Sequence, residues 1–92
     1  MQATLVILCL SLSAANPCSP GVSVATSCGD IDSHGCCTDS NSVQWCEDGV
    51  LCELSCAEQP ACGWRIEGGI YDCGTLPASD PTCQFPFSCK AP

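Results

Sequence analysis

Positive charge is scarce in this chain: two Lys or Arg stand against ten Asp or Glu among 92 residues, a formal net charge of −8 at pH 7. Nucleic acids and anionic membranes are bound by clustered Lys and Arg that release counterions, so this composition argues against both classes of partner. Basic peptides, glycans and Ca²⁺ remain compatible with it. The simplest interpretation is that the acidic surface keeps a small secreted domain soluble.

Histidine is scarce as well, since His34 is the only one. Hydrolytic sites built on a nucleophile need a base that a third group holds in place. Acid–base catalysis by two carboxylates needs a shared cleft, which a disulfide-rich domain of this size rarely encloses. We therefore expect no enzyme activity and no cofactor, and we place His34 in a solvent-exposed loop.

Large side chains are few, with two Trp, one Tyr and two Phe, whereas cysteine is abundant at 12 copies. Such a cysteine content is typical of a short secreted disulfide scaffold. A domain this small buries too little apolar surface to offset its chain entropy, so cross-links must stabilise it. Disulfides persist outside the cytosol, which predicts an extracellular or cell-surface location.

The chain divides by composition into four parts. Residues 1–15 resemble a signal peptide, because the apolar stretch is far shorter than the roughly 20 residues that span a bilayer. Cleavage would leave Asn16 first, and 16–27 is then a Pro/Gly/Ser-rich flexible arm. The dense cysteines define a disulfide-rich domain at 28–89, followed by a tail at 90–92. No membrane insertion is expected.

Two antiparallel hairpins are predicted inside the domain, at about 43–54 and 63–73. Asp48-Gly49 supplies the turn of the first, and Gly68-Gly69 that of the second. The residues after Cys73 are loop. The fold class is thus small, disulfide-rich and mainly β, with long loops and little or no helix.

Signal removal takes Cys9 and leaves eleven cysteines, so one is unpaired or linked to another chain. Cys18 is the natural candidate because it lies in the arm, and a disulfide-linked dimer through Cys18 is the corresponding partner prediction. The alternatives are Cys52, Cys83 or an uncleaved Cys9. The predicted framework consists of ten cysteines: Cys28, Cys36, Cys37, Cys46, Cys52, Cys56, Cys62, Cys73, Cys83 and Cys89.

Adjacent Cys36 and Cys37 are expected to take different partners, because successive side chains of an extended chain point to opposite faces. Thiolate metal binding is disfavoured: Cys52-x₃-Cys56 lacks a matching second pair. For Ca²⁺, Asp30-x-Asp32-x-His34-Gly35 only partly matches a calcium loop, and Asp39, Glu47 and Asp48 are also interpreted as solvated turn acids. No metal site is predicted.

Several motifs together resemble a known module. They are Gly35-Cys36-Cys37, Trp45-Cys46, Cys62-Gly63-Trp64, Tyr71-Asp72-Cys73 and Phe85-Pro86 with Cys89. The pattern is similar to a cysteine-rich domain of secreted and cell-surface proteins of myxobacteria and their relatives, over about Ser27 to Cys89. That resemblance implies a disulfide framework without an assigned activity. Its pattern has eight cysteines, and the two additional ones here, Cys52 and Cys83, suggest an extra Cys52–Cys83 bridge.

Three functions are weighed. The first is a secreted non-enzymatic module, structural or interaction-mediating, with an unknown protein or glycan partner. The second is a small secreted effector, toxin-like or protease-inhibiting, with Arg65 facing a protease; the third is a Ca²⁺-binding module. Trp64 and Arg65 are the candidate partner-facing residues, although the aromatics, Trp45 above all, and the Phe85-Pro86-Phe87 lid are expected mainly to cover the core.

Overall fold

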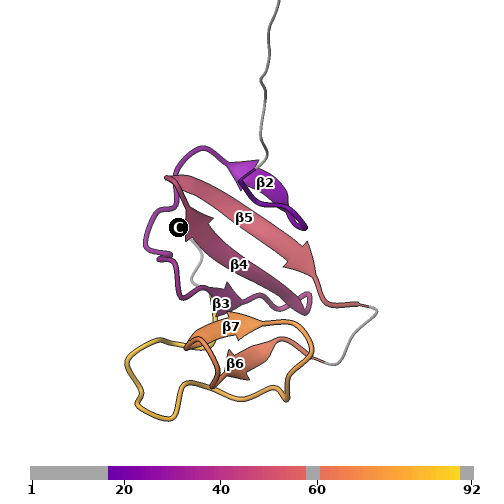
Figure 1. Ribbon diagram of the computed structural model, residues 1–92, viewed down its shortest axis with the longest axis vertical. Coiled ribbons are helices and arrows are strands. Elements are labelled where there is room, and N and C mark those ends of the chain that lie inside the picture. The colour runs from indigo at the N-terminus through magenta and orange to yellow at the C-terminus, as the bar shows by residue number, and fades with distance from the viewer. Residues whose placement is uncertain (1–16, 58–60, 90–92) are drawn as a thin grey trace, which may run out of the picture.

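The computed structural model describes residues 17–57 and 61–89, so the predicted signal peptide at 1–15 and tail at 90–92 lie outside the described residues. Within these ranges the chain forms strands and no helix, in two antiparallel sheets (Figure 1). The predicted fold class is confirmed. The strands are β2 Val22–Ala25, β3 Cys36–Cys37, β4 Ser42–Glu47, β5 Val50–Ser55, β6 Gly63–Arg65 and β7 Ile70–Asp72.

The first predicted hairpin is present as β4 and β5, paired from Ser42↔Ser55 to Glu47↔Val50. Its two turn residues both have positive φ, 53° at Asp48 and 79° at Gly49. A two-residue turn of this handedness matches the twist of the flanking strands. The Asp-Gly signal in the sequence therefore specified the turn correctly.

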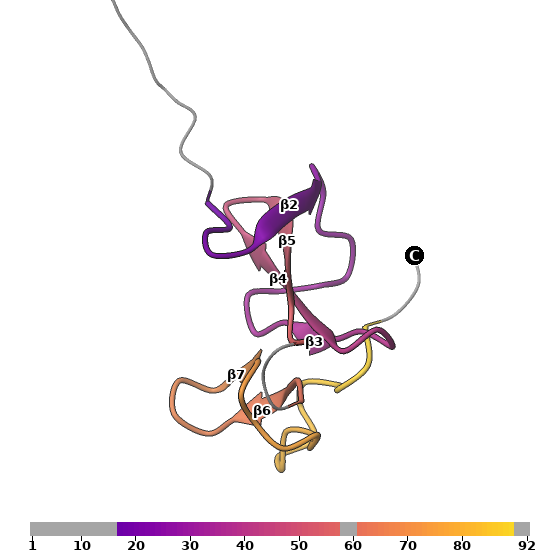
Figure 2. The same ribbon diagram turned by 90° about the vertical axis from the view of Figure 1, so that its right-hand side faces the viewer.

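The segment expected to be a flexible arm instead contains β2, which pairs with the outer edge of β5 (Figure 2). This corrects the boundary at residue 28, since the folded unit includes residues before it. Gly21 permits the approach: a Cβ there would lie 2.5 Å from the Glu53 carbonyl oxygen and 2.8 Å from the Trp45 ring. The short alternation Val-Ser-Val-Ala supplies the strand itself.

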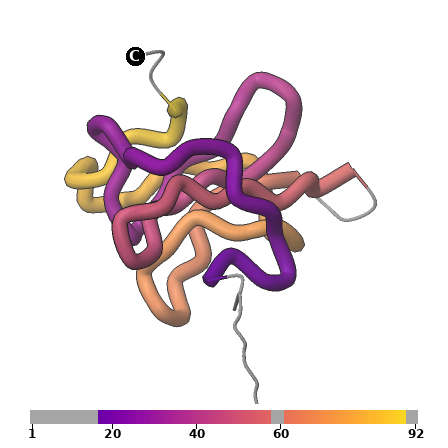
Figure 3. The backbone as a smooth tube through the Cα atoms, turned by 90° about the horizontal axis from the view of Figure 1, so that it is seen from above, coloured from indigo at the N-terminus to yellow at the C-terminus, as the bar shows by residue number. Residues whose placement is uncertain are grey.

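The four-stranded sheet has the order β2-β5-β4-β3, so β3 forms its other edge. The C-terminal segment runs alongside β3: Cys37 donates its N–H to the Phe87 carbonyl at 2.6 Å, and Cys89 donates to the Cys37 carbonyl at 3.0 Å. Seen from above, this yellow segment lies beside the chain that leads into β3 (Figure 3). Residues about 50 positions apart in sequence are thereby brought together.

The second predicted hairpin is also present, with β6 and β7 paired as a separate two-stranded sheet. Its turn uses Gly68 and Gly69, whose φ values are 93° and 62°. A backbone bond from the Tyr71 N–H to the His34 carbonyl at 2.9 Å links β7 to the segment just before β3, and β7 also contacts β3 itself. The two sheets thus meet along β3 and β7.

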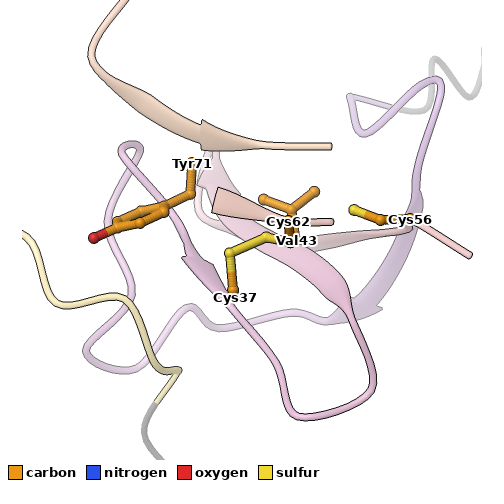
Figure 4. Packing of buried hydrophobic residues seen from close by; sticks show 5 residues of the cluster. All are labelled: Cys37, Val43, Cys56, Cys62 and Tyr71. Carbon is orange, nitrogen blue, oxygen red and sulfur yellow. A yellow bond between two sulfur atoms is a disulfide. The ribbon is translucent and has the colours of Figure 1, made fainter. Parts of the chain in front are cut away.

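The core between the sheets is small and rich in sulfur (Figure 4). Its fully buried members are Cys37, Val43, Cys56, Cys62 and Tyr71, each at most 2% exposed. Three of these five are half-cystines, so disulfides replace the aliphatic packing that a larger domain would use. The same residues therefore supply both cross-links and core packing in this fold.

Candidate functional site

Five disulfides join ten of the cysteines in the described residues: Cys18–Cys52, Cys28–Cys46, Cys36–Cys89, Cys37–Cys62 and Cys56–Cys73. The expectation that Cys36 and Cys37 have different partners is confirmed. The Cys37–Cys62 and Cys56–Cys73 bonds connect the two sheets, whereas Cys36–Cys89 anchors the C-terminal segment.

The prediction of an unpaired Cys18 is wrong, because Cys18 is bonded to Cys52. Pairing of β2 with β5 brings Cys18 to Cys52, with Cα atoms 5.3 Å apart, well within disulfide range. The bridge suggested between Cys52 and Cys83 is therefore also wrong. Cys83 is the free cysteine of the described residues, exposed in a loop at a φ of 64°.

Aromatic side chains form a connected stack rather than an exposed platform. His34 stacks on Phe85 at 3.8 Å between ring centroids, and Phe85 in turn stacks on Trp64 at 5.9 Å. Trp64 meets the edge of Tyr71, which meets Phe87. The candidate partner-facing Trp64 is thus partly buried against the core, and His34 is half-buried rather than fully exposed in its loop.

Trp45 and the Phe85-Pro86-Phe87 segment lie at the edge of the buried core. Trp45, Phe85 and Phe87 are partly buried and pack against the buried cluster. The Trp45 indole Nε1–H donates to Glu47 Oε1 at 2.9 Å. Both the core assignment of Trp45 and the lid interpretation of residues 85–87 agree with this placement.

Asp80 is a buried carboxylate, 3% exposed, that organises the loop before the lid. Its oxygens accept hydrogen bonds from the Thr82 N–H at 2.8 Å and from the Gln84 and Phe85 N–H groups at 3.1 Å each. The Thr82 hydroxyl donates as well, at 2.7 Å to Oδ2. Burial raises the pKa of the Asp80 carboxyl, but the bonds from Thr82, Phe85 and Gln84 outweigh it and hold that pKa below its ordinary value.

Tyr71 connects this loop to the core. Its hydroxyl donates to the Phe85 carbonyl at 2.5 Å and accepts the Asp80 N–H at 3.0 Å. Burial raises the pKa of Tyr71, and the nearby Asp80 charge adds to the increase. Sequence analysis missed this network, because the loop showed only turn residues; the pairing of Asp80 with Thr82 two positions later is the one local signal, typical of an Asx turn.

Arg65, the other candidate partner-facing residue, is held within its own hairpin. Its Nη1 lies 2.6 Å from Asp72 Oδ2, and its Nε–H donates to the Glu67 carbonyl at 2.9 Å. The Arg65 side chain is 44% exposed, so a partner can approach it. Insertion into a deep pocket on a partner would require that both bonds break.

The carboxylates considered for Ca²⁺ have separate local environments. Asp32 Oδ1 accepts the His34 N–H at 2.9 Å and lies 3.4 Å from His34 Nδ1. Asp48 sits in the β4–β5 turn, and Asp39 is exposed in another loop. Within residues 17–57 and 61–89, no three His, Cys, Asp or Glu side chains are arranged to hold a metal ion.

A groove of about 300 Å³ lies between the segment before β3 and the C-terminal segment. One wall carries Asp30 and Asp32, and the other carries Phe85 and Pro86. The Cys36–Cys89 disulfide joins the two walls. A second groove of about 420 Å³ shares Asp30 and Ile31 with the first and continues toward Ala25 and Leu51. We refer to the first as the Asp30–Pro86 groove.

Among the described residues, no helix is long and apolar enough to cross a bilayer. Comparison with known proteins finds no match to any family model, curated protein or solved structure. The resemblance to the myxobacterial cysteine-rich domain therefore stays a prediction.

Proposed function

We propose that this chain is a secreted, non-enzymatic extracellular module that presents a disulfide-fixed surface to a protein or glycan partner. The observation that carries the proposal is the Asp30–Pro86 groove, both of whose walls are held in place. Cys28–Cys46 and Cys36–Cys89 anchor the acidic wall, and Cys36–Cys89 also anchors the opposite one. A surface that is already ordered avoids the entropic cost of ordering on binding.

The internal network of Asp80 supports the same proposal. It fixes the backbone of Gln84 and Phe85 immediately before the groove-lining Pro86. Hydrogen bonds of this number stabilise a loop whose residues are otherwise mostly exposed. The five disulfides favour an oxidising, extracellular compartment for this work.

Protease inhibition through Arg65 is less well supported. A specificity residue must enter the pocket of the enzyme, whereas Arg65 is bonded to Asp72 and to the Glu67 carbonyl. Each charge-assisted bond would have to be replaced in the complex. We therefore expect trypsin activity to be unaffected by an equimolar amount of the protein.

The proposal is tested by comparing the oxidised protein with reduced and alkylated protein on glycan and peptide arrays. We expect a defined set of ligands that only the oxidised protein binds, because reduction releases both groove walls. Cys83→Ser serves as a control that removes a thiol without removing a disulfide, and it should bind as the wild type does. Equal binding by oxidised and reduced protein, or stoichiometric inhibition of trypsin, would contradict the proposal.

A further inference from the structure

We infer that the Asp30–Pro86 groove receives a Lys or Arg side chain from a basic peptide segment of a partner protein. This inference rests on the proposed function and specifies the chemistry of its partner. It is carried by the combination of an acidic wall, an apolar wall and a fixed width within one small groove.

The acidic wall has unused charge. Within the described part of the chain, the Asp30 carboxylate has no ion pair or hydrogen bond. Asp32 uses Oδ1 for the His34 N–H, while its side chain remains 56% exposed. Arg65, the sole Lys or Arg of residues 17–57 and 61–89, lines a different depression on the β6–β7 hairpin. Among the described residues no Lys or Arg meets this wall, and a cationic side chain would be its electrostatic complement.

The apolar wall favours a cation that has an apolar stem. Phe85 and Pro86 line the groove opposite the two carboxylates. Lys and Arg side chains have an apolar stem and a charged end, so the stem can cover the apolar wall while the charge meets the carboxylates. Pockets for small-molecule ligands start at about 300 Å³, so the volume of this groove suits one side chain better than a larger ligand.

Both walls are in position before a ligand arrives. Ile31 donates its N–H to the Cys28 carbonyl at 3.0 Å, and Gly35 donates to the Asp32 carbonyl at 3.2 Å. The opposite wall is held by Cys36–Cys89 and by the Phe85 N–H bonded to Asp80. Binding therefore requires little rearrangement of this chain.

The second groove argues for a peptide rather than a free cation. It shares Asp30 and Ile31 with the first and extends across Gln44 and Leu51 of the large sheet. Residues flanking the basic side chain would lie there, adding contacts that a small polyamine cannot make. We therefore assign the occupant as a segment of a protein.

The test is an NMR titration of the oxidised full chain with a short peptide, blocked at both termini, whose only charged residue is one arginine. Its matched control is the same peptide with citrulline, which has the shape of arginine without the charge. We expect saturable amide shifts confined to the residues that line the two grooves, at 25–36, 44, 51 and 85–89. The affinity should be at least about 3-fold weaker for the citrulline peptide. Raising the ionic strength from about 0.01 to 0.15 M shortens the Debye length from about 30 to 8 Å and should weaken binding.

The matched variants are Asp30→Asn/Asp32→Asn and Asp39→Asn/Asp48→Asn, which change the net charge equally. The amide introduced by Asp32→Asn retains an oxygen that can accept the His34 N–H, so the fold should persist, as an unchanged amide spectrum would verify. We expect the first variant to weaken binding of the arginine peptide about 3- to 10-fold. The second should change it less than about 2-fold, because its acids lie outside the groove.

Equal effects of the two variants, equal affinity of the citrulline peptide, shifts mainly outside the two grooves, or spermidine binding as tightly as the peptide would each overturn the inference. Failure of the inference is separable from failure of the proposed function. If oxidation-dependent ligands appear on the arrays while the arginine peptide leaves the groove unshifted, only the inference falls. If no array ligand distinguishes oxidised from reduced protein, the proposed function falls as well.

Discussion

Replacement of Cys18 and Cys52 together by Ser tests the most consequential correction to the sequence analysis. Both cysteines have 0% exposure and are bonded to each other, so the segment 17–27 depends on them for its attachment to β5. Replacing both avoids leaving one reactive thiol in the core. We expect a clear loss of stability, because β2 has only the short pairing with β5 to hold it otherwise.

The magnitude follows from the 34-residue separation of the two cysteines. In the chain-entropy description, a loop of that length lowers the entropy of the unfolded chain by about 12.6 cal/mol/K, which corresponds to about 3.8 kcal/mol at 25 °C. Single domains have total stabilities of about 5–15 kcal/mol. The double variant should therefore lose a large fraction of its free energy of unfolding.

Equilibrium unfolding in urea, followed by the fluorescence of Trp45 and Trp64, measures this difference under oxidising conditions. Cys83→Ser is the control, since its side chain is exposed and unpaired within the described residues, and it should change the free energy of unfolding by less than about 0.5 kcal/mol. If Cys83→Ser destabilises the protein while the double variant does not, the assignment of the free cysteine is refuted.

Four further predictions concern single positions. Tyr71→Phe leaves the buried Asp80 N–H and the partly buried Phe85 carbonyl without the Tyr71 hydroxyl and should cost about 2–4 kcal/mol in urea unfolding, whereas a loss below about 0.5 kcal/mol would contradict the network. Because the pKa of Asp80 is lowered in the folded state, the ionised carboxylate adds to the free energy of unfolding above the unfolded pKa, and this stabilisation is lost as pH falls through the folded pKa. Asp80→Asn should therefore flatten the decline in stability below about pH 4. Gly49→Ala, at a φ of 79° with open space around it, should cost about 1–2 kcal/mol of stability. Gly63→Ala should cost more, because its Cβ would overlap the Leu76 carbonyl. Equal melting temperatures of the two variants would refute the distinction. Peptide mapping after native alkylation should find Cys83 modified, and modification of Cys18 instead would reverse the assignment.

The two hairpins could be predicted because their turns are encoded locally. Asp48-Gly49 and Gly68-Gly69 adopt the positive φ values that only a few residue types tolerate. The separate partners of Cys36 and Cys37 also followed from a local rule, the alternation of side chains along an extended chain. These features depend on residues that are neighbours in sequence.

The remaining features depend on contacts between distant segments. β2 leaves Val22 and Val24 exposed, at 59% and 47%, so its position depends on pairing with β5 rather than on a side chain buried in the core. The Asp80 network likewise depends on Tyr71 from another element. The groove joins residues near 30 with residues near 86, and their proximity depends on a disulfide partner that the sequence left open among many.

The adjacency of Cys36 and Cys37 has a consequence for the order of oxidation as the chain is synthesised. Cys62 emerges before Cys89, so both neighbours compete for Cys62 while the final segment is still absent. The native pairing, Cys37 with Cys62 and Cys36 with Cys89, gains the backbone bonds from the Cys37 N–H to the Phe87 carbonyl and from the Cys89 N–H to the Cys37 carbonyl only once residues 87–89 are present. An early bond between Cys36 and Cys62 would have to be reshuffled by thiol–disulfide exchange, so the native pairing of the two neighbours depends on the contacts of residues 87–89 with β3.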